Sequence, residues 1–362
     1  MKQQFTIQAI TNCTIEFEGT IEYSIDNGHT WSVLKRLSLP AGHEAQFRNA
    51  QCKSCGCFCI RGTFNAYGCL STLAPYGSKV FSGLFRDTGI INAGKLVLDF
   101  EELWESCYDK MFKGCVRLTT APELPATKLA DYCYEDMFNG CISLDVAPEL
   151  PAATLAEGCY SYMFSGCIFL MTAPELPATT LVNRCYYSMF SDCTSLAKAP
   201  ELPATALAKS CYSAMFHGCT SLETAPELPA TTLAICCYQN MFYCCRSLTK
   251  APELPATALA SSCYDSMFAG CTSLRKAPEL PATTLAYGCY QHMFNSCTNL
   301  TSSPSVLPAT TLAQYCYAFM FSNCSSLITE PELPATTLVE GCYSCMFYGC
   351  RSIKDWIKKS RQ

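Results

Sequence analysis

Charged side chains are scarce in this chain of 362 residues. Asp, Glu, Lys and Arg make up 15% of it, against about 25% in a typical soluble domain. Apolar residues make up 49%, which excludes a disordered chain, because disorder combines low hydrophobicity with high charge. A basic excess is missing too, since the net charge is −5. Without basic side chains to neutralise phosphates, we expect no nucleic-acid partner.

Long apolar runs are also absent from the sequence. No stretch reaches the roughly 18 uninterrupted apolar residues of a transmembrane helix, so we expect no membrane insertion. The first eleven residues lack the apolar core of a signal peptide, which predicts a non-secreted chain or one without its leader. The four histidines are scattered, and no Ser-His-Asp, Cys-His or phosphate-loop pattern accompanies them. We therefore expect neither an enzyme nor a cofactor.

Cysteine is abundant instead, with 29 residues, and most of them belong to a repeat. The pair Cys-Tyr recurs in ten copies from Cys107 to Cys342, in steps of 26 residues except for one of 27 between Cys289 and Cys316. Met-Phe follows each pair, and a second cysteine lies eight residues after the first. The remainder reads roughly Thr-Ser-Leu-x-x-Ala-Pro-Glu-Leu-Pro-Ala-Thr-Thr-Leu-Ala. Such a period lies within the range of about 20–29 residues of leucine-rich repeats.

Each repeat is expected to hold one short helix and one short strand. At about 100° per residue, Leu155, Cys159, Met163 and Phe164 fall on one half of a helical wheel, which predicts an amphipathic helix with its constant face inward. The prolines that follow exclude helix, so residues 144–150 and their counterparts are expected as short strands of a parallel sheet. The predicted fold class is an α/β repeat solenoid of the leucine-rich-repeat type.

A small all-β domain is expected before the repeats. Residues 5–9, 14–17 and 20–25 alternate apolar and polar side chains, and Asp26-Asn27-Gly28 is a hairpin-turn signal. These patterns predict a β-sandwich-like domain. The expected organisation is this domain over residues 1–75, a solenoid over 76–353 that opens with a degenerate copy, and a C-terminal cap over 354–362.

The Cys-Tyr-x-x-Met-Phe-x-Gly-Cys and Ala-Pro-Glu-Leu-Pro motifs resemble the BspA-like leucine-rich-repeat proteins of anaerobic gut and oral bacteria. The likeness covers residues 76–353, and residues 23–31 resemble part of the β domain that often precedes such arrays. The resemblance implies a surface or secreted adhesion protein that binds a protein or glycan without catalysis. Exported members carry a leader and none is visible here, so a cytoplasmic or virion-associated location is the alternative. The alternative role is a structural or assembly component of a virion or a multi-subunit appendage. Its array would be a spacer, and homo-oligomers would form through its N-terminal domain.

The cysteines have two expected roles. Residues eight apart on a helix are about 12 Å apart, beyond the 4.4–6.8 Å that a disulfide bridges, so the repeat cysteines are expected as buried free thiols. The other set, Cys52, Cys55, Cys57 and Cys59, offers four thiolates for zinc. All four lie within eight residues, and on a strand the last three share one face. A disulfide or packing role is therefore favoured over a metal site.

Two sets of side chains are candidates for binding. Glutamates of Ala-Pro-Glu-Leu-Pro would stack at about 4.8 Å, so that each neighbouring pair repels by roughly 1 kcal/mol in water. Such a row suits a basic partner or Ca²⁺; the alternative is a turn acceptor, relieved by backbone N–H groups or by Lys198, Lys250 and Lys276. Aromatic residues at variable positions suit recognition, or are drift on a solvated face. The candidates are Glu123, Glu149, Glu175, Glu201, Glu227, Glu253, Glu279, Glu332, Tyr162, Tyr187, Tyr243 and Tyr287.

Overall fold

The computed structural model describes residues 2–51, 57–74, 79–100 and 102–353. Contacts divide the chain into two compact units, Met1–Leu176 and Pro177–Gln362, and each is described by itself. This division falls among the repeats, so it does not test the boundary expected after residue 75. The expected cap over residues 354–362 lies outside the described residues. Both remain predictions.

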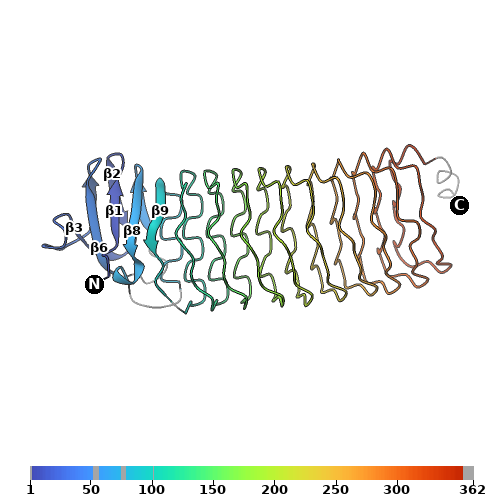
Figure 1. The fold of residues 1–362 in the computed structure, drawn as a ribbon, viewed down its shortest axis with the longest axis horizontal. Coiled ribbons are helices and arrows are strands. Elements are labelled where there is room, and N and C mark those ends of the chain that lie inside the picture. The colour runs from blue at the N-terminus through green and yellow to red at the C-terminus, as the bar shows by residue number, and fades with distance from the viewer. Residues whose placement is uncertain (1, 52–56, 75–78, 101, 354–362) are drawn as a thin grey trace. The chain divides into compact units, whose positions relative to one another are not determined.

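Two β-sheets occupy the N-terminal part of the first unit (Figure 1). One has the strand order β4-β3-β6-β1-β8-β9 and the other β5-β2-β7. Only the β8–β9 pair is parallel; the other pairs are antiparallel. The elements are β1 (Thr6–Ala9), β2 (Cys13–Phe17), β3 (Thr20–Ser24), β4 (Ser32–Val33), β5 (Leu37–Leu39), β6 (Glu44–Gln51), β7 (Phe58–Arg61), β8 (Phe64–Cys69), the 3-10 helix η1 (Leu70–Thr72) and β9 (Ile90–Val97). Strands β1, β2 and β3 lie where the alternation predicted strands.

Aromatic side chains fill the space between the two sheets. The ring of Phe58, on β7, lies 5.9 Å from Phe5 and 5.2 Å from Phe47, which belongs to β6 of the other sheet. Phe85 also stacks on Phe58, at 5.9 Å with 8° between the ring planes. The N–H of Phe85 donates to the carbonyl of Met111 in the first full repeat. The sheets and the beginning of the array therefore share one core.

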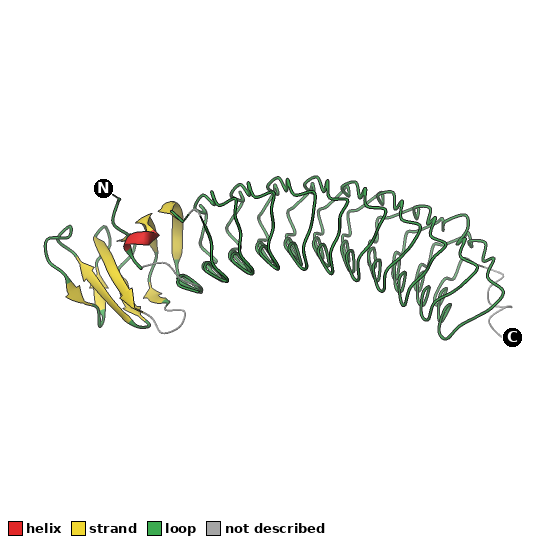
Figure 2. Cartoon of the chain, turned by 90° about the horizontal axis from the view of Figure 1, so that it is seen from below, coloured by secondary structure: helices red, strands yellow, loops and turns green. Residues whose placement is uncertain are grey.

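The predicted helix in each repeat is wrong. Figure 2 shows strands and a short helix only toward the N-terminus, and loops and turns along the array. In the Cys-Tyr-x-x-Met-Phe-x-Gly-Cys segment every fourth residue has a left-handed φ, for example Cys236 at 55°, Asn240 at 56° and Cys244 at 59°. An α-helix cannot pass through such residues, because their carbonyls and N–H groups point the wrong way. The segment is a run of reverse turns, called the turn segment below.

Backbone hydrogen bonds in the turn segment alternate between two directions. The N–H of Met241 donates to Tyr238 within the same repeat at 3.2 Å, and the N–H of the adjacent Phe242 donates to Met267 of the next repeat at 2.9 Å. Half of the N–H groups thus close turns, and the other half join successive repeats as in a parallel ladder. A helix would satisfy all of these groups by itself, whereas here half of them find a partner only when the repeats stack.

The run of turns explains why the helical wheel wrongly predicted an amphipathic helix. Constant residues recur at steps of four, as in Cys237, Met241 and Cys245, and all three are fully buried. A step of four on an α-helix turns by only about 40°, so a period of four also leaves these residues on one half of the wheel. The inward direction of the constant residues is right, although the backbone that carries them is not helical.

Ring stacks run along the core of each unit. In the second unit Tyr212 and Tyr238 lie 5.9 Å apart with 6° between their planes, and Phe216 and Phe242 lie 5.7 Å apart with 8°. The expected strands over residues 144–150 and their counterparts are isolated parallel bridges, such as Lys198 with Thr224. The prolines beside the bridges lack N–H groups and cannot extend a ladder.

Candidate binding surface

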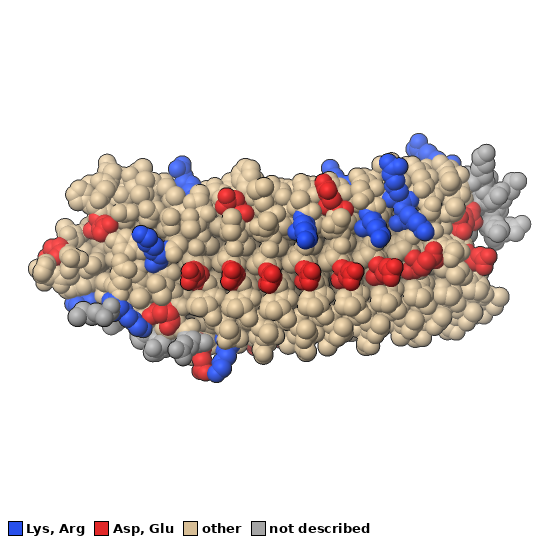
Figure 3. Space-filling model, viewed as in Figure 1, with Lys and Arg blue, Asp and Glu red and all other residues tan. Residues whose placement is uncertain are grey.

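The predicted glutamate row is exposed in the structure. All eight side chains are exposed at the centre of their Pro-Glu-Leu-Pro segments, which alanine precedes in seven copies and Glu330 in the last. The parallel bridges beside these segments fix equivalent residues of neighbouring repeats at the same level. In Figure 3 acidic side chains form a row along one face of the repeats. The members are Glu123, Glu149 and Glu175 in the first unit and Glu201, Glu227, Glu253, Glu279 and Glu332 in the second.

Grooves lie between neighbouring glutamates. One, of about 540 Å³, is lined by residues of two adjacent repeats that include Glu123 and Glu149. Another, of about 480 Å³, is lined by the equivalent segments around Glu227 and Glu253. Both have walls of Thr, Ala, Pro and Leu with a carboxylate on each side; Val146 adds to the first groove and the cationic Lys250 to the second. Each unit therefore offers a similar groove, largely apolar along its walls and with two carboxylates at its rim; in the second unit Lys250 also lines it.

Cationic side chains of the described residues lie near the row without pairing with it, and Lys250 lines the groove of Glu227 and Glu253. Among the ion pairs of the described residues, none joins a glutamate of the row to Lys198, Lys250 or Lys276. Within the described part of the chain, hydrogen bonds relieve the row at Glu279: Ser305, which replaces glutamate in its copy, donates its N–H and hydroxyl to Glu279 Oε2 at 3.1 and 2.8 Å. Elsewhere the carboxylates face solvent, which favours a cationic partner.

The predicted tyrosines lie on another part of the repeat, in or beside the turn segment. Tyr287 is the most exposed, at 52%, and meets Tyr315 edge-on at 5.7 Å. Tyr162, Tyr187 and Tyr243 are half-buried against neighbouring side chains. Arg184 lies over the ring of Tyr187 at 4.3 Å, and His217 stacks on Tyr243 at 5.0 Å. The structure thus does not bring the glutamates and tyrosines into one patch.

One recurring arrangement on the turn segment was not predicted. The hydroxyl of Tyr132 donates to Glu157 Oε1 at 3.1 Å, and its ring covers Gly158, where a Cβ would lie 2.5 Å from the ring. Tyr315, Glu340 and Gly341 repeat this arrangement. Alignment of the copies shows the signal: a Glu-Gly pair one repeat after the tyrosine.

The nearest approach to a hydrolytic constellation involves His217. Ser191 Oγ lies 3.4 Å from His217 Nδ1, and Asp192 Oδ1 lies 3.8 Å from the same nitrogen. A triad needs the nucleophile and the carboxylate on opposite nitrogens of the imidazole, so that one orients the ring while the other gives up its proton. Because Ser191 and Asp192 both face Nδ1 of His217, the three side chains do not form a proton relay.

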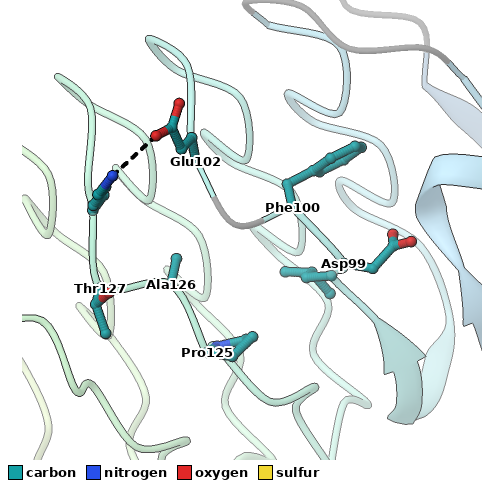
Figure 4. A pocket seen from close by; sticks show the side chains of 8 residues that line it. Asp99, Phe100, Glu102, Pro125, Ala126 and Thr127 are labelled. Atoms are coloured by element: carbon teal, nitrogen blue, oxygen red, sulfur yellow. Dashed lines mark hydrogen bonds and ion pairs between the residues drawn. The ribbon is translucent and has the colours of Figure 1, made fainter.

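A pocket of about 410 Å³ in the first unit also lacks available functional groups (Figure 4). Its carboxylate Glu102 is paired with Lys128 at 3.1 Å across the mouth. The other carboxylate, Asp99, accepts hydrogen bonds from Lys2 at 2.6 Å and from the Ser71 side chain. Since protein groups already occupy both carboxylates, the pocket is a weak candidate for ligand binding.

The cysteines before the repeats give part of a metal-binding set. Cys52 and Cys55 lie outside the described residues. Cys57 and Cys59 are within reach of Glu18, which the sequence did not single out. Burial, followed by the neighbouring Glu18 and Cys59, raises the pKa of the Cys57 thiol to about 12. The three side chains thus lie close enough to act on one another, and each offers one ligand atom to a metal ion.

The twenty repeat cysteines are buried thiols in the structure. Those of the second position are hydrogen-bond donors: Cys271 Sγ donates to the carbonyl of Phe242 in the preceding repeat at 3.0 Å, and Cys297 to that of Phe268 at 3.1 Å. Burial raises the pKa of Cys211 to about 12. These thiols are therefore core groups with a poor tendency to ionise.

The family of the chain follows from its repeats. The sequence profile described as a BspA type leucine rich repeat region (6 copies) matches residues 105–248, 206–328 and 262–360. The chain belongs to the BspA-type leucine-rich repeat family. The expected family and its repeat fold are thereby confirmed, and members of this kind are repeat proteins suited to protein interaction. None of the curated proteins matches the chain.

One solved structure resembles this BspA-type protein. The crystal structure of a leucine-rich repeat protein from Bacteroides ovatus ATCC 8483 shares 19% sequence identity and covers 68% of this chain and 75% of its own. The TM-score is 0.29, so this likeness carries no argument about function. Among the described residues, no helix has the length and apolar character needed to cross a bilayer.

Proposed function

We propose that this BspA-type protein is a non-enzymatic binding protein whose glutamate row recognises a basic segment of a macromolecular partner. The exposed carboxylates at the rims of repeated grooves, none of which forms an ion pair among the described residues, carry this proposal. A row of like charges repels itself by roughly 1 kcal/mol per neighbouring pair in water. A partner that places Lys or Arg between neighbouring carboxylates relieves this repulsion in every repeat that it contacts.

The proposal also includes where the protein would bind its partner. Adhesion at a bacterial surface, or after secretion, is the role that the family resemblance implies. The apolar groove walls suit a protein segment better than a glycan, because they are lined by Pro, Ala and Leu. Ca²⁺ is a poorer occupant, since it prefers six to eight oxygen ligands and each groove supplies two carboxylates.

Titration with poly-L-lysine as the probe tests the proposal. The variant E227Q/E253Q/E279Q removes three neighbouring charges of the row and keeps the side-chain shape. At about 0.5 kcal/mol for each exposed charge, we expect about tenfold weaker binding at low salt. The control variant E223Q/E330Q/E340Q removes three charges of the same unit outside the row.

Salt and the control decide the outcome. Wild-type binding should weaken as ionic strength rises, because exposed charges are screened. Equal binding by the row variant and the control would contradict recognition by the row. If the wild-type chain does not bind poly-L-lysine and self-associates in sedimentation, the assembly role is favoured. Contacts between copies would then form through the N-terminal domain.

A further inference from the structure

The outer face of the three-stranded sheet gathers three metal-binding side chains at one end of the β2–β7 pair. Glu16 lies opposite Cys59 in this antiparallel ladder, so Glu18 lies opposite Cys57. The N–H of Glu18 donates to the carbonyl of Cys57 at 3.1 Å and holds this register. Residues 57 and 59 share a face because they are two apart on an extended chain, and Phe58 between them points into the core.

The distances fit one small metal ion. The two Sγ atoms and a carboxylate oxygen of Glu18 lie within 4.8 Å of one another. Zinc bonds of about 2.3 Å to sulfur and 2.0–2.2 Å to oxygen, in a tetrahedron, hold ligand atoms roughly 3.5–3.8 Å apart. Side-chain rotation alone closes this difference. Cys59 and Glu18 are exposed and Cys57 is half-buried, so an ion reaches the cluster from solvent.

Neighbouring cations do not satisfy the cluster. Arg36 pairs with Glu16 on the same face, at 3.4 Å, and leaves Glu18 to the two thiols. Across the described residues, no ion pair includes Glu18. Two thiols that ionise on binding a metal and one carboxylate thus converge, and no cation of the described residues pairs with them.

We propose that Glu18, Cys57 and Cys59 form a binding site for a thiophilic divalent metal ion, with zinc as the ion of choice. Two thiolates select zinc over Mg²⁺ and Ca²⁺, which prefer oxygen ligands. Three protein ligands leave a fourth position for water. The ion clamps the end of β2 to β7, so its binding stabilises the sheet without contact with the glutamate row.

Cobalt serves as the spectroscopic probe of this site in the reduced full-length protein. Wild type and C52S/C55S should each bind a single Co²⁺ with thiolate-to-cobalt charge-transfer absorption. Zn²⁺ should displace it, and millimolar Mg²⁺ should not. The variants C57S and C59S should lose at least about 100-fold in affinity and E18Q at least about tenfold, since loss of an outer-shell partner alone costs about 10–100-fold.

Matched controls separate the site from general effects. E16Q alters a glutamate on the same face, and C345S alters an exposed cysteine of the second unit, so both should bind as wild type does. Zn²⁺ should also raise the thermal midpoint of wild type and not of C59S. Absence of the absorption band in wild type, its loss in C52S/C55S, or its persistence in C59S would overturn the proposal.

Discussion

The ring of Tyr315 occupies the space that a side chain on Gly341 would need. A Cβ built on Gly341 collides with Tyr315 Cδ1 and Cε1, and the tyrosine hydroxyl donates to Glu340 Oε1 at 2.9 Å. Tyr132, one repeat before Gly158, has the same relationship in the first unit. Repeats that differ in sequence are thus matched in pairs, with a large residue in one copy and glycine in the next.

This relationship predicts a specific cost for G341A. Gly341 and Gly288 share a left-handed φ, of 62° and 56°, so alanine strains both backbones alike. A Cβ on Gly288 meets the flexible Gln291 side chain at 3.0 Å and Ser262 Oγ at an ordinary contact distance of 3.5 Å. We expect G341A to lower the free energy of unfolding by about 1–3 kcal/mol more than G288A does, because overpacking is added to strain. Equal losses in urea denaturation would contradict the account, and G341A/Y315A should recover the difference.

The second cysteine of each repeat should contribute as a donor and by filling space. C271A removes the S–H bond to Phe242 and leaves a small cavity in a fully buried site. We expect a loss of about 1–3 kcal/mol in the free energy of unfolding, measured in urea under reducing conditions. C345A, at an exposed cysteine, should stay within about 0.5 kcal/mol of wild type. If C271A had the same free energy of unfolding as wild type, the thiols at the second position of the repeats would not stabilise the core.

The buried tyrosine stack should tolerate loss of a hydroxyl. Tyr238 Oη is buried and has no hydrogen-bond partner among the described residues, while its ring packs between Tyr212 and Tyr264. We expect Y238F to unfold at the same temperature as wild type or higher, because an unsatisfied buried hydroxyl opposes folding. Y238A should lose about 3–5 kcal/mol. A marked loss of thermal stability in Y238F would mean that the hydroxyl is used.

Alkaline pH should unfold the array steeply. Burial raises the pKa of the Cys107 thiol to about 11 and that of Cys211 to about 12, and it raises the pKa of Tyr134 well above its ordinary value. A raised folded pKa gives stability that is fully present below the unfolded value, near 9 for cysteine, and is lost as the pH rises. Each such group costs up to about 1.4 kcal/mol per pH unit in this window. Circular dichroism from pH 7 to 11 measures the loss, and stability unchanged at pH 10.5 would contradict buried thiols.

The sequence predicted the repeat, its period and its inward residues. Cys237, Met241 and Cys245 are buried as expected, because identity in every copy follows from packing against the next copy. The backbone could not be predicted from this pattern, since residues four apart share a side both in a helix and in a run of turns. The positions with a left-handed φ could not be predicted either. Only some of them are glycine, and other residues there, such as Arg184 and Cys244, rarely adopt this φ.

The candidate site was predicted unevenly for a similar reason. The exposed glutamates could be predicted because each lies between two prolines at the same position of its repeat. Equivalent positions of stacked repeats lie side by side, so the repeat alone places the glutamates in a row. Glu18 was missed because its contact with Cys57 depends on the pairing of two strands that are distant in sequence. The interaction of Tyr315 with Gly341 required the exact offset between turns of neighbouring copies, which the sequence does not give by itself.

Thiol mapping by mass spectrometry tests the central claim most directly. This claim is that the repeat cysteines and the residues beside them form the core, and that the outer residues are available for binding. Without reductant, the native protein should be alkylated at the exposed Cys59 and Cys345, and more slowly at the half-buried Cys57, Cys236 and Cys244. The twenty repeat thiols should react only after unfolding, still without reductant. Reaction of the repeat thiols in the native state, or only after reduction, would contradict the account.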